Sequence, residues 1–269
     1  MGLVEGKVAF VTGAARGQGR AHCVRLAREG ADIIGLDLCG PLPVSTKPAS
    51  RADLDETVRL VEAEGRQMHA EVGDVRSLAN LERVVASGVA RFGHLDIVVA
   101  NAGITGTGLL WELTEQQWQD MIDIDLTGVW KTLKAVVPTM IAQGTGGSIV
   151  LTSSVAGVKG LPFCAHYVAA KHGVVGLCRT LANELGQHDI RVNSIHPAGV
   201  QTDMIANTTD FSELTARFQD TLGPIFMNAL PYHVVQPEDV ADLVLFLASD
   251  QSRYITGAQL PLDLGSLNR

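Results

Sequence analysis

Short apolar segments alternate with longer segments of helical pattern along this whole chain, and no linker separates them. Strands of a parallel sheet are buried on both faces, so they appear as continuous apolar runs, each followed by a crossover helix. The pattern predicts one α/β domain over residues 1–269, a doubly wound parallel sheet of about seven strands with helices on both faces. Strands are expected at 7–12, 31–37, 68–73, 95–101, 148–153, 190–196 and 259–262, and helices at 17–29, 53–64, 77–92, 114–142, 167–185 and 237–248.

Two segments interrupt this alternation. Residues 38–52 form an insert that carries three prolines, and residues 202–236 form a long irregular stretch with amphipathic pieces. Loops of this length inside a compact domain are usually functional or disordered. The insert follows the second strand, so we expect it either to cover a ligand at the sheet edge or to be a mobile surface loop. For residues 202–236 we expect a mobile substrate lid.

Composition and charge exclude several classes of partner. With 29 acidic and 21 basic residues the net charge is −8, which argues against nucleic acid or an anionic membrane as the main partner. No apolar run approaches the roughly 18 residues of a membrane span, and charges interrupt the N-terminus before a secretory core forms. A cytoplasmic protein is expected. The cysteines lack Cys-x-x-Cys spacing and the histidines form no ligand-spaced cluster, so we expect reduced thiols and no metal.

A glycine-rich turn joins the first expected strand to the first helix. Gly13 permits a sharp turn, Gly17 lets a pyrophosphate approach the backbone, and Gly19 allows close packing of helix on strand. Unpaired N–H groups at the helix N-terminus then face the phosphates. This strand–turn–helix order, with an acidic residue after the next strand, predicts a Rossmann-type dinucleotide site.

Asp37 and Arg16 bear on the choice between NAD and NADP. Asp37, at the end of the second strand, can accept hydrogen bonds from the adenosine ribose and would repel a 2′-phosphate. Arg16 could meet that phosphate, bind the pyrophosphate or remain solvated. Because repulsion between close like charges excludes a ligand, whereas Arg16 has several possible uses, NAD is the predicted cofactor.

Ser154, Tyr167 and Lys171 form the constellation that predicts catalysis. Tyr167 and Lys171 are four residues apart, so they share one face of a helix. A free phenol titrates near ~10, too high for acid/base chemistry at neutral pH. Lowering that pKa by about three units takes roughly 4 kcal/mol, which one ammonium about 4 Å away supplies at an effective dielectric of about 20. We therefore predict Tyr167 as general acid/base with a lowered pKa, Lys171 as the cation, and Ser154 as hydrogen-bond donor to the substrate oxygen.

These motifs occur in the order typical of short-chain dehydrogenase/reductases, which the chain resembles over its whole length. The resemblance rests on the glycine turn, Asp74-Val75, Asn101-Ala102-Gly103, Ser154, Tyr167-x-x-x-Lys171 and Pro197-Ala198-Gly199. The insert after Asp37, with the strings Asp-Leu-Cys, Glu-Thr-Val-Arg-Leu-Val-Glu and Val-Val-Ala-Asn-Ala-Gly-Ile, resembles a narrower branch. That branch is the carveol-dehydrogenase-like, mycofactocin-coupled enzymes of actinobacteria. It implies NAD that does not exchange and is regenerated by an external electron carrier.

The resemblance implies an NAD-dependent oxidoreductase that acts on CH–OH groups. It also implies a homotetramer, since relatives pair the helices at 114–142 and 167–185 across two-fold axes. Asp74 and Val75 would flank the adenine, Lys171 would bind the nicotinamide ribose, and residues 197–202 would hold the nicotinamide. The cofactor residues implied are Gly13, Ala15, Arg16, Gly17, Gln18, Gly19, Asp37, Leu38, Asp74, Val75, Asn101, Ala102, Gly103, Thr152, Tyr167, Lys171, Pro197, Gly199, Val200, Thr202 and Met204.

Asp125 departs from the family pattern, which usually has asparagine in this Asn-Leu-Thr-Gly context. In relatives the backbone carbonyl at this position is thought to hold a water linked to the lysine, and such a role survives substitution. An ionised Asp125 near Lys171 would offset part of the cation's effect and raise the pKa of Tyr167, which predicts a more alkaline pH optimum than that of an asparagine variant. The alternative is that Asp125 caps a kinked helix and lies too far away to matter.

The substrate pocket is expected beside the nicotinamide, at the carboxyl ends of the strands. Its candidate walls are apolar, which favours a neutral, hydrophobic secondary alcohol or ketone such as a cyclic terpenoid. Two other functions remain open, an NADPH-dependent biosynthetic ketoreductase and a non-catalytic dinucleotide sensor or scaffold. The candidate wall residues are Ile104, Trp111, Val155, Leu161, Phe163, Met204, Phe226 and Met227.

Overall fold

The computed structural model describes residues 2–44, 47–206 and 209–269. Seven strands in these ranges form a single sheet in the order β3-β2-β1-β4-β5-β6-β7, and every neighbouring pair is parallel. The predicted doubly wound sheet is therefore confirmed. The strands are β1 (Val8–Thr12), β2 (Asp32–Asp37), β3 (Met68–Val72), β4 (Ile97–Ala100), β5 (Gly147–Thr152), β6 (Ile190–Pro197) and β7 (Gln259–Leu262).

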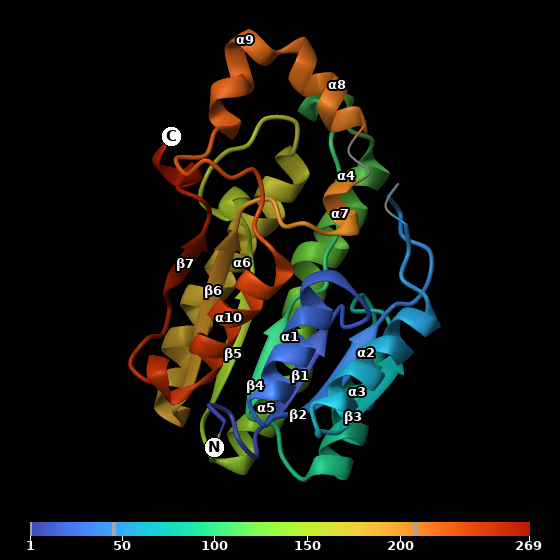
Figure 1. The fold of residues 1–269 in the computed structure, drawn as a ribbon, viewed down its shortest axis with the longest axis vertical. Helices are drawn as coiled ribbons and strands as arrows, with labels where there is room; N and C mark the ends of the chain where they lie inside the picture. The colour runs from blue at the N-terminus through green and yellow to red at the C-terminus, as the bar shows by residue number, and fades with distance from the viewer. Residues whose placement is uncertain (1, 45–46, 207–208) are drawn as a thin grey trace.

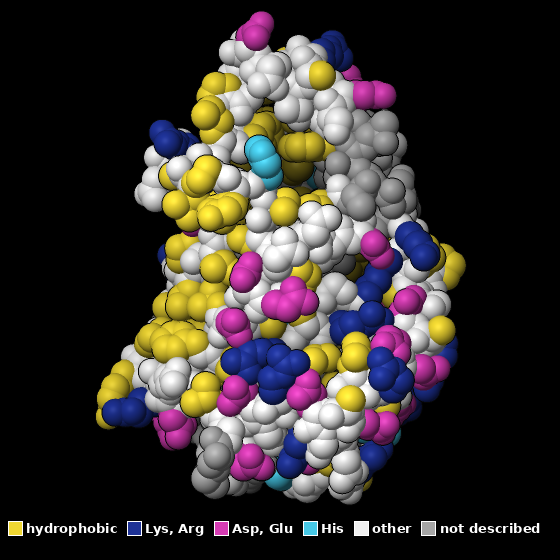
Figure 2. Space-filling view, in the orientation of Figure 1, with side chains coloured by type: hydrophobic (Ala, Val, Ile, Leu, Met, Phe, Trp, Pro, Cys, Tyr) yellow, Lys and Arg dark blue, Asp and Glu magenta, His cyan; other side chains and the backbone are white. Residues whose placement is uncertain are grey.

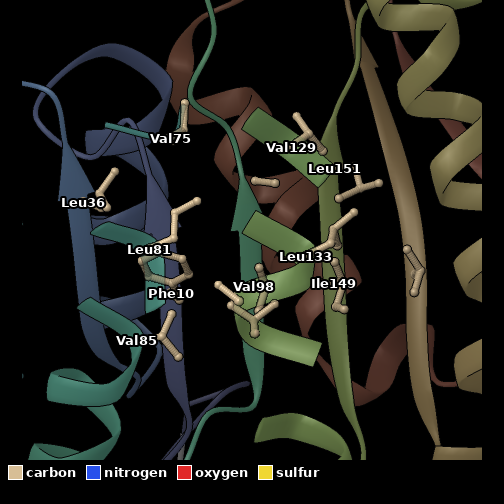
Figure 3. Close-up of a cluster of buried hydrophobic side chains, with 14 of the residues drawn as sticks. Phe10, Leu36, Val75, Leu81, Val85, Val98, Val129, Leu133, Ile149 and Leu151 are labelled. Atoms are coloured by element: carbon tan, nitrogen blue, oxygen red, sulfur yellow. The ribbon is translucent and has the colours of Figure 1, made fainter. Parts of the chain in front are cut away.

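Helices cover both faces of the sheet (Figure 1). On one face lie α1 (Gly17–Arg28), α2 (Arg51–Ala63) and α10 (Pro237–Ala248), and on the other α3 (Leu78–Phe92), α5 (Gly128–Gln143) and α6 (Ala165–Leu185). Alternate residues of a strand point to opposite faces, so β1 supplies Phe10 to one hydrophobic cluster and Val11 to the other. Figure 3 shows part of the first cluster, which includes Phe10 and Val98 of the sheet and Leu81 of α3. Burial on both faces explains why the strands are uniformly apolar.

The long helix expected at 114–142 is present, but it is not one continuous α-helix. It opens with α4 (Glu115–Ile122), where Thr114 and Gln117 form the predicted capping box. Between α4 and α5 the segment η2 (Asp123–Thr127) is a π-helical turn, and Asp125 within it is fully buried. Single π-helical turns inside α-helices frequently occur at functional sites. The π-helical turn places the side chain of Asp125 in the interior of the domain.

The two segments outside the alternation lie at the carboxyl end of the sheet (Figure 1). In the described part of the insert, residues 38–44 and 47–50 form no helix or strand, and Ser50 caps α2 by accepting a hydrogen bond from Asp53 N–H. The lid at 202–236 is more helical than the irregular stretch expected, with α7 (Asp203–Ala206), α8 (Thr209–Arg217), α9 (Gln219–Leu222) and the 3₁₀ turn η5 (Gly223–Phe226). Residues 45–46 of the insert and 207–208 of the lid lie outside the described residues.

Within the described ranges, no helix combines the length and apolar character needed to cross a membrane.

Candidate active site

The glycine turn after β1 has the backbone geometry that its sequence predicts. Gly13 has a φ of 69°, a left-handed conformation that favours glycine. A Cβ added at Gly19 would lie 1.9 Å from the carbonyl oxygen of Gly13, so no side chain fits there. The start of α1 can therefore pack against the turn only because position 19 is glycine, and the turn leaves an open cradle for a phosphate group.

Asp37 fixes the shape of the same cradle. It ends β2 and is buried, with Oδ2 accepting a hydrogen bond from Ala15 N–H at 2.9 Å and Oδ1 accepting one from Cys39 N–H at 3.0 Å. The carboxylate thus links the glycine turn to the first residues of the insert. It also lines the cavity described below, where it can meet the ribose as predicted.

A cavity of about 420 Å³ opens along the carboxyl ends of β1, β2 and β4. Glycines of the turn, the insert and the start of the lid all contribute to its wall, so the residues present fit a dinucleotide. Of the predicted cofactor residues, those lining it are Gly13, Arg16, Gly17, Gln18, Gly19, Asp37, Leu38, Asp74, Val75, Asn101, Ala102, Gly103, Thr202 and Met204. Ala15, Thr152, Tyr167, Lys171, Pro197, Gly199 and Val200 are not among its lining residues.

Several lining residues escaped the sequence analysis. Leu42, Val44 and Lys47 reach the cavity from the insert, which accords with the expectation that this segment covers a ligand. Arg20, one position beyond the glycine turn, donates to the carbonyl oxygens of Ala15 at 2.6 Å and of Asp53 at 2.8 Å. Only the place of Arg20 next to the turn could have marked it in the sequence.

Asn101 joins the ends of two central strands. Its side-chain Nδ2 donates to the carbonyl oxygen of Thr12 at 3.0 Å, and Thr12 Oγ1 accepts from the N–H groups of Asn101 at 3.0 Å and Ala102 at 3.1 Å. These bonds tie the end of β4 to the end of β1. Asn101 therefore supports the central sheet at the edge of the cavity.

Lys171 and Tyr167 share one face of α6, as their spacing predicts. Lys171 is only 3% exposed, and its Nζ lies 5.4 Å from the centre of the Tyr167 ring. The same Nζ donates to the carbonyl oxygen of Thr152 at 3.1 Å. The ammonium is thus held in a fixed position between the end of β5 and the phenol.

Ser154 follows β5, and its side chain accepts a hydrogen bond from Ala156 N–H at 3.2 Å. The backbone carbonyl of Ser154 contacts His196 of β6, a buried residue that the sequence analysis did not single out. His196 Nδ1 lies 2.7 Å from the carbonyl oxygen of Ser154, and Nε2 lies 2.9 Å from Ser194 Oγ. Burial lowers the pKa of His196, so its ring is neutral and Nδ1 can donate to that carbonyl. No local motif marks His196.

Asp125 lies in direct contact with Lys171. Its Oδ2 is 3.0 Å from Lys171 Nζ, and its Oδ1 accepts a hydrogen bond from Ile104 N–H at 2.8 Å. The side chain has no exposed surface, so this is a buried ion pair. The alternative that Asp125 lies too far from Lys171 to matter is wrong.

The electrostatics of Tyr167 differ from the prediction of a lowered pKa. Burial raises the pKa of the phenol above its ordinary value, Lys171 lowers it, Asp125 raises it, and a hydrogen bond with Ser154 lowers it. The net direction is upward. The argument for a lowered pKa counted the cation alone and left out the loss of solvent, whereas the rise in pKa expected from an ionised Asp125 is in the observed direction.

Arg16 has a partner in the lid. Its Nη1 lies 2.9 Å from Asp203 Oδ2 in α7, and both residues line the cavity. Thr202 lies against the glycine turn as well, since a Cβ added at Gly17 would be 3.2 Å from its Cγ2. The lid therefore begins at the pyrophosphate cradle, and Arg16 is in an ion pair rather than solvated.

Aromatic side chains connect the lid to the segment before α6. Phe163 is stacked with Phe226, with ring centres 6.3 Å apart, and is 5.6 Å from Phe218; Phe226 meets Phe211 edge-on at 5.2 Å. Figure 2 shows hydrophobic side chains gathered in a hollow below α8 and α9. Phe163 also has a φ of 68°, a strained conformation for a bulky residue, and its carbonyl accepts from Gly108 N–H at 2.8 Å.

The other predicted wall residues lie in different surroundings. Ile104 is buried and lines the cavity, Val155 is buried, and Leu161 is partly buried. Trp111 is 77% exposed and Met227 is 56% exposed, and neither lines the cavity. The structure of this chain alone therefore brings Phe163 and Phe226 together but leaves Trp111 and Met227 on the surface.

Comparisons with known proteins agree with this geometry. A family model described as enoyl-(acyl carrier protein) reductase matches residues 13–266. The chain is 47% identical to a (−)-trans-carveol dehydrogenase of Rhodococcus erythropolis, over 99% of each sequence. It is 52% identical to an NAD-dependent oxidoreductase of Mycobacterium tuberculosis, over 99% of this chain and 98% of that protein.

Two solved structures superpose on the whole chain. One is carveol dehydrogenase from Mycobacterium avium in complex with NAD, with a TM-score of 0.95 and 49% identity. The other is a short-chain dehydrogenase from Mycobacterium paratuberculosis bound to NAD, with a TM-score of 0.97 and 50% identity. In both comparisons all of each chain is covered.

Proposed function

This chain belongs to the short-chain dehydrogenase/reductase family as an NAD-dependent enzyme, and we propose that it interconverts a hydrophobic secondary alcohol and its ketone with Tyr167 as general acid/base. The observation that carries the proposal is the buried ammonium of Lys171, which lies 5.4 Å from the centre of the Tyr167 ring, while Tyr167 makes a hydrogen bond with the Ser154 side chain. These three groups can hold one oxygen atom and move one proton to or from it.

The chain's own residues account for the cofactor and proton positions. The glycine turn and Asp37 would hold the pyrophosphate and adenosine ribose, and Lys171 would hold the nicotinamide ribose. NAD bound there supplies the acceptor or donor of a hydride. In oxidation Ser154 donates a hydrogen bond to the substrate oxygen, and the Tyr167 phenolate takes the hydroxyl proton.

A carveol-like terpenoid is the proposed substrate class. A relative with 47% identity is a (−)-trans-carveol dehydrogenase. The aromatic contacts of Phe163, Phe218 and Phe226 favour an apolar ring system. Lys159, the cation of the same loop, donates to the carbonyl oxygens of Ile225 at 2.9 Å and Ser266 at 2.7 Å, so its role is to hold the lid and C-terminus rather than to bind an anionic substrate.

We also propose that NAD is retained between turnovers and regenerated by an external electron carrier, as in mycofactocin-coupled enzymes. Support comes from the insert, whose Leu42 and Val44 both line the cavity and pack against the hydrophobic core. Extensively dialysed protein should release NAD into the supernatant on denaturation. No released NAD would mean that the cofactor exchanges freely.

A homotetramer is the proposed assembly. Trp118 of α4 and Trp130 of α5 are exposed on the helices that relatives pair across two-fold axes. Sedimentation of the purified protein at micromolar concentration would give four times the chain mass of 28.6 kDa. A monomer at that concentration would contradict the proposal.

The central experiment is a panel of secondary alcohols tested with free NAD, with NADP and with an artificial dye acceptor. Tyr167→Phe should lower kcat by about 10² to 10⁴-fold, the range for losing a positioned acid/base, while NAD binding persists. Turnover unchanged in Tyr167→Phe would exclude the proposed role, and a strong preference for NADP would favour a biosynthetic ketoreductase instead.

A further inference from the structure

Asp125 and Lys171 form an ion pair deep inside the domain, and this pair sets the charge that surrounds Tyr167. The pair joins the π-helical turn η2 to α6 at 3.0 Å, with both side chains buried. Lys171 Nζ also donates to Thr152 O, and Asp125 Oδ1 accepts from Ile104 N–H. Each partner is thus held from a second side, so neither can turn away from the other without losing a buried hydrogen bond.

The other titratable groups around the phenol are neutral near pH 7. Burial raises the pKa of the Cys164 thiol to about 11, so this residue before α6 carries no charge. Burial lowers the pKa of His166 in α6 and of His196 in β6, so both imidazoles are neutral. The charges that face Tyr167 are therefore those of the Lys171–Asp125 pair. Burial raises the pKa of the Asp125 carboxyl, while Lys171 and the Ile104 N–H lower it, so the negative charge of Asp125 depends on its contact with Lys171.

The two opposite charges remove most of the driving force for forming a phenolate. Burial tends to lower the pKa of Lys171, but Asp125 raises it, and the net direction is upward. Lys171 thus stays protonated, yet its charge is shared with a carboxylate in direct contact. An anion formed on the partly buried Tyr167 would be the one uncompensated charge among these three side chains, and such a charge is costly where little solvent reaches it.

We propose that Asp125 is a positioning residue that keeps Tyr167 protonated near neutral pH, so that the resting site is set for carbonyl reduction. The inference rests on the proposed function and adds the direction that it favours. In reduction a hydride from reduced NAD forms the new C–H bond at the carbonyl carbon, and the Tyr167 hydroxyl proton forms the new O–H bond as the C=O π bond breaks. The phenolate left beside Lys171 then regains a proton from solvent. The reverse reaction needs the phenolate first and gains as pH rises.

The test compares Asp125→Asn with Asp123→Asn. Asparagine has nearly the same shape as aspartate and keeps an oxygen to accept from Ile104 N–H. Asp123 lies in the same π-helical turn, but its partner is Gln119 Nε2 at 2.8 Å on the exposed side, so it is a matched control. In Asp125→Asn the positive charge of Lys171 has no carboxylate beside it. The Tyr167 hydroxyl should therefore lose its proton at a lower pH than in the wild type.

Tyrosinate absorbance provides a measurement that needs no substrate. The chain has three tyrosines, and Tyr232 and Tyr254 are exposed. Subtracting the titration of Tyr167→Phe therefore isolates Tyr167. Asp125→Asn should move this titration down by roughly one to three pH units, as expected for removing a nearby like charge, and Asp123→Asn should leave it in place. An unchanged curve in Asp125→Asn overturns the inference.

Two further measurements complete the test. Removing one partner of a buried ion pair is destabilising. If Asp125→Asn does not fold, the tyrosinate titration of the wild-type protein tests the inference instead. Tyr167 should titrate above the ordinary phenol value of 10.0, and titration below pH 8 overturns the inference. With an active substrate, the ratio of oxidation to reduction rates at pH 7 should rise about tenfold for each pH unit by which the Tyr167 titration moves down. A changed titration without turnover on any substrate contradicts the proposed function but leaves the role of Asp125 standing.

Discussion

The cofactor side and the lid side of the cleft are built in different ways. On the cofactor side, Asp37, Asn101 and Thr12 hold the strand ends through hydrogen bonds of 2.9 to 3.1 Å that involve backbone groups. On the lid side, backbone hydrogen bonds such as Val235 N–H to Gly199 O at 2.9 Å anchor the end of the segment. The short helices before it meet the domain largely through side chains, with Phe163 and Phe226 in the middle. A backbone framework tolerates one shape, whereas aromatic contacts between short helices can be repacked. We therefore expect the cofactor side to accept one cofactor shape and the lid side to accept substrates of several shapes.

The largest expected effect comes from Gly19→Ala on the cofactor side. The new Cβ would lie 1.9 Å from Gly13 O and 2.7 Å from Gly13 C, so the turn must move. Overpacking of this kind costs about 3 kcal/mol, which corresponds to roughly a 100-fold rise in the Kd for NAD. Titration calorimetry with NAD measures this, and Gly186→Ala is the control because nothing lies within 4 Å of its added Cβ. Equal affinity in both variants would show that the turn is as adaptable as the lid.

A smaller effect is expected from Phe226→Ala on the lid side. Burying a side chain of this size contributes about 1.5–3 kcal/mol, and we expect the loss of the stacked contact with Phe163 to remove about 1.4 kcal/mol of it. KM for an apolar substrate should therefore rise about tenfold. The Kd for NAD should not change. Met227→Ala is the control, since this neighbour is largely exposed. If Met227→Ala raises KM as much, Met227 lines the occupied pocket as its sequence position predicts.

The smallest effect is expected where the two sides meet, in Asp203→Asn. The Arg16–Asp203 pair is partly exposed, and such pairs contribute about 0.2–1 kcal/mol. The dissociation rate of NAD should rise by roughly 1.5- to 5-fold at low salt, and the difference should vanish at high salt because screening weakens exposed pairs. Stopped-flow release of NAD measures this, with Asp220→Asn as control. A larger rise in the NAD dissociation rate that does not depend on salt would mean that the start of the lid is a fixed part of the cofactor site.

The parts of the fold that were predictable are those set by neighbouring residues. The seven strands and their helices follow from apolar runs and helical periodicity, and the cradle follows from Gly13, Gly19 and Asp37. The short helices of the lid were not predicted, because their packing depends on Phe163, a residue distant in sequence. His196 was missed for the same reason, since its contact with Ser154 crosses from one strand end to another.

The sequence by itself determined the sheet, the dinucleotide cradle and the identity of Ser154, Tyr167 and Lys171, because glycine conformation and helical spacing are local properties of the chain. Only the tertiary structure decided the charge state that surrounds Tyr167. Asp125 could be identified as an unusual residue in the sequence, but its 3.0 Å contact with Lys171 depends on a π-helical turn packing against a different helix. Electrostatic energy depends on distance and burial, and neither exists until the chain has folded.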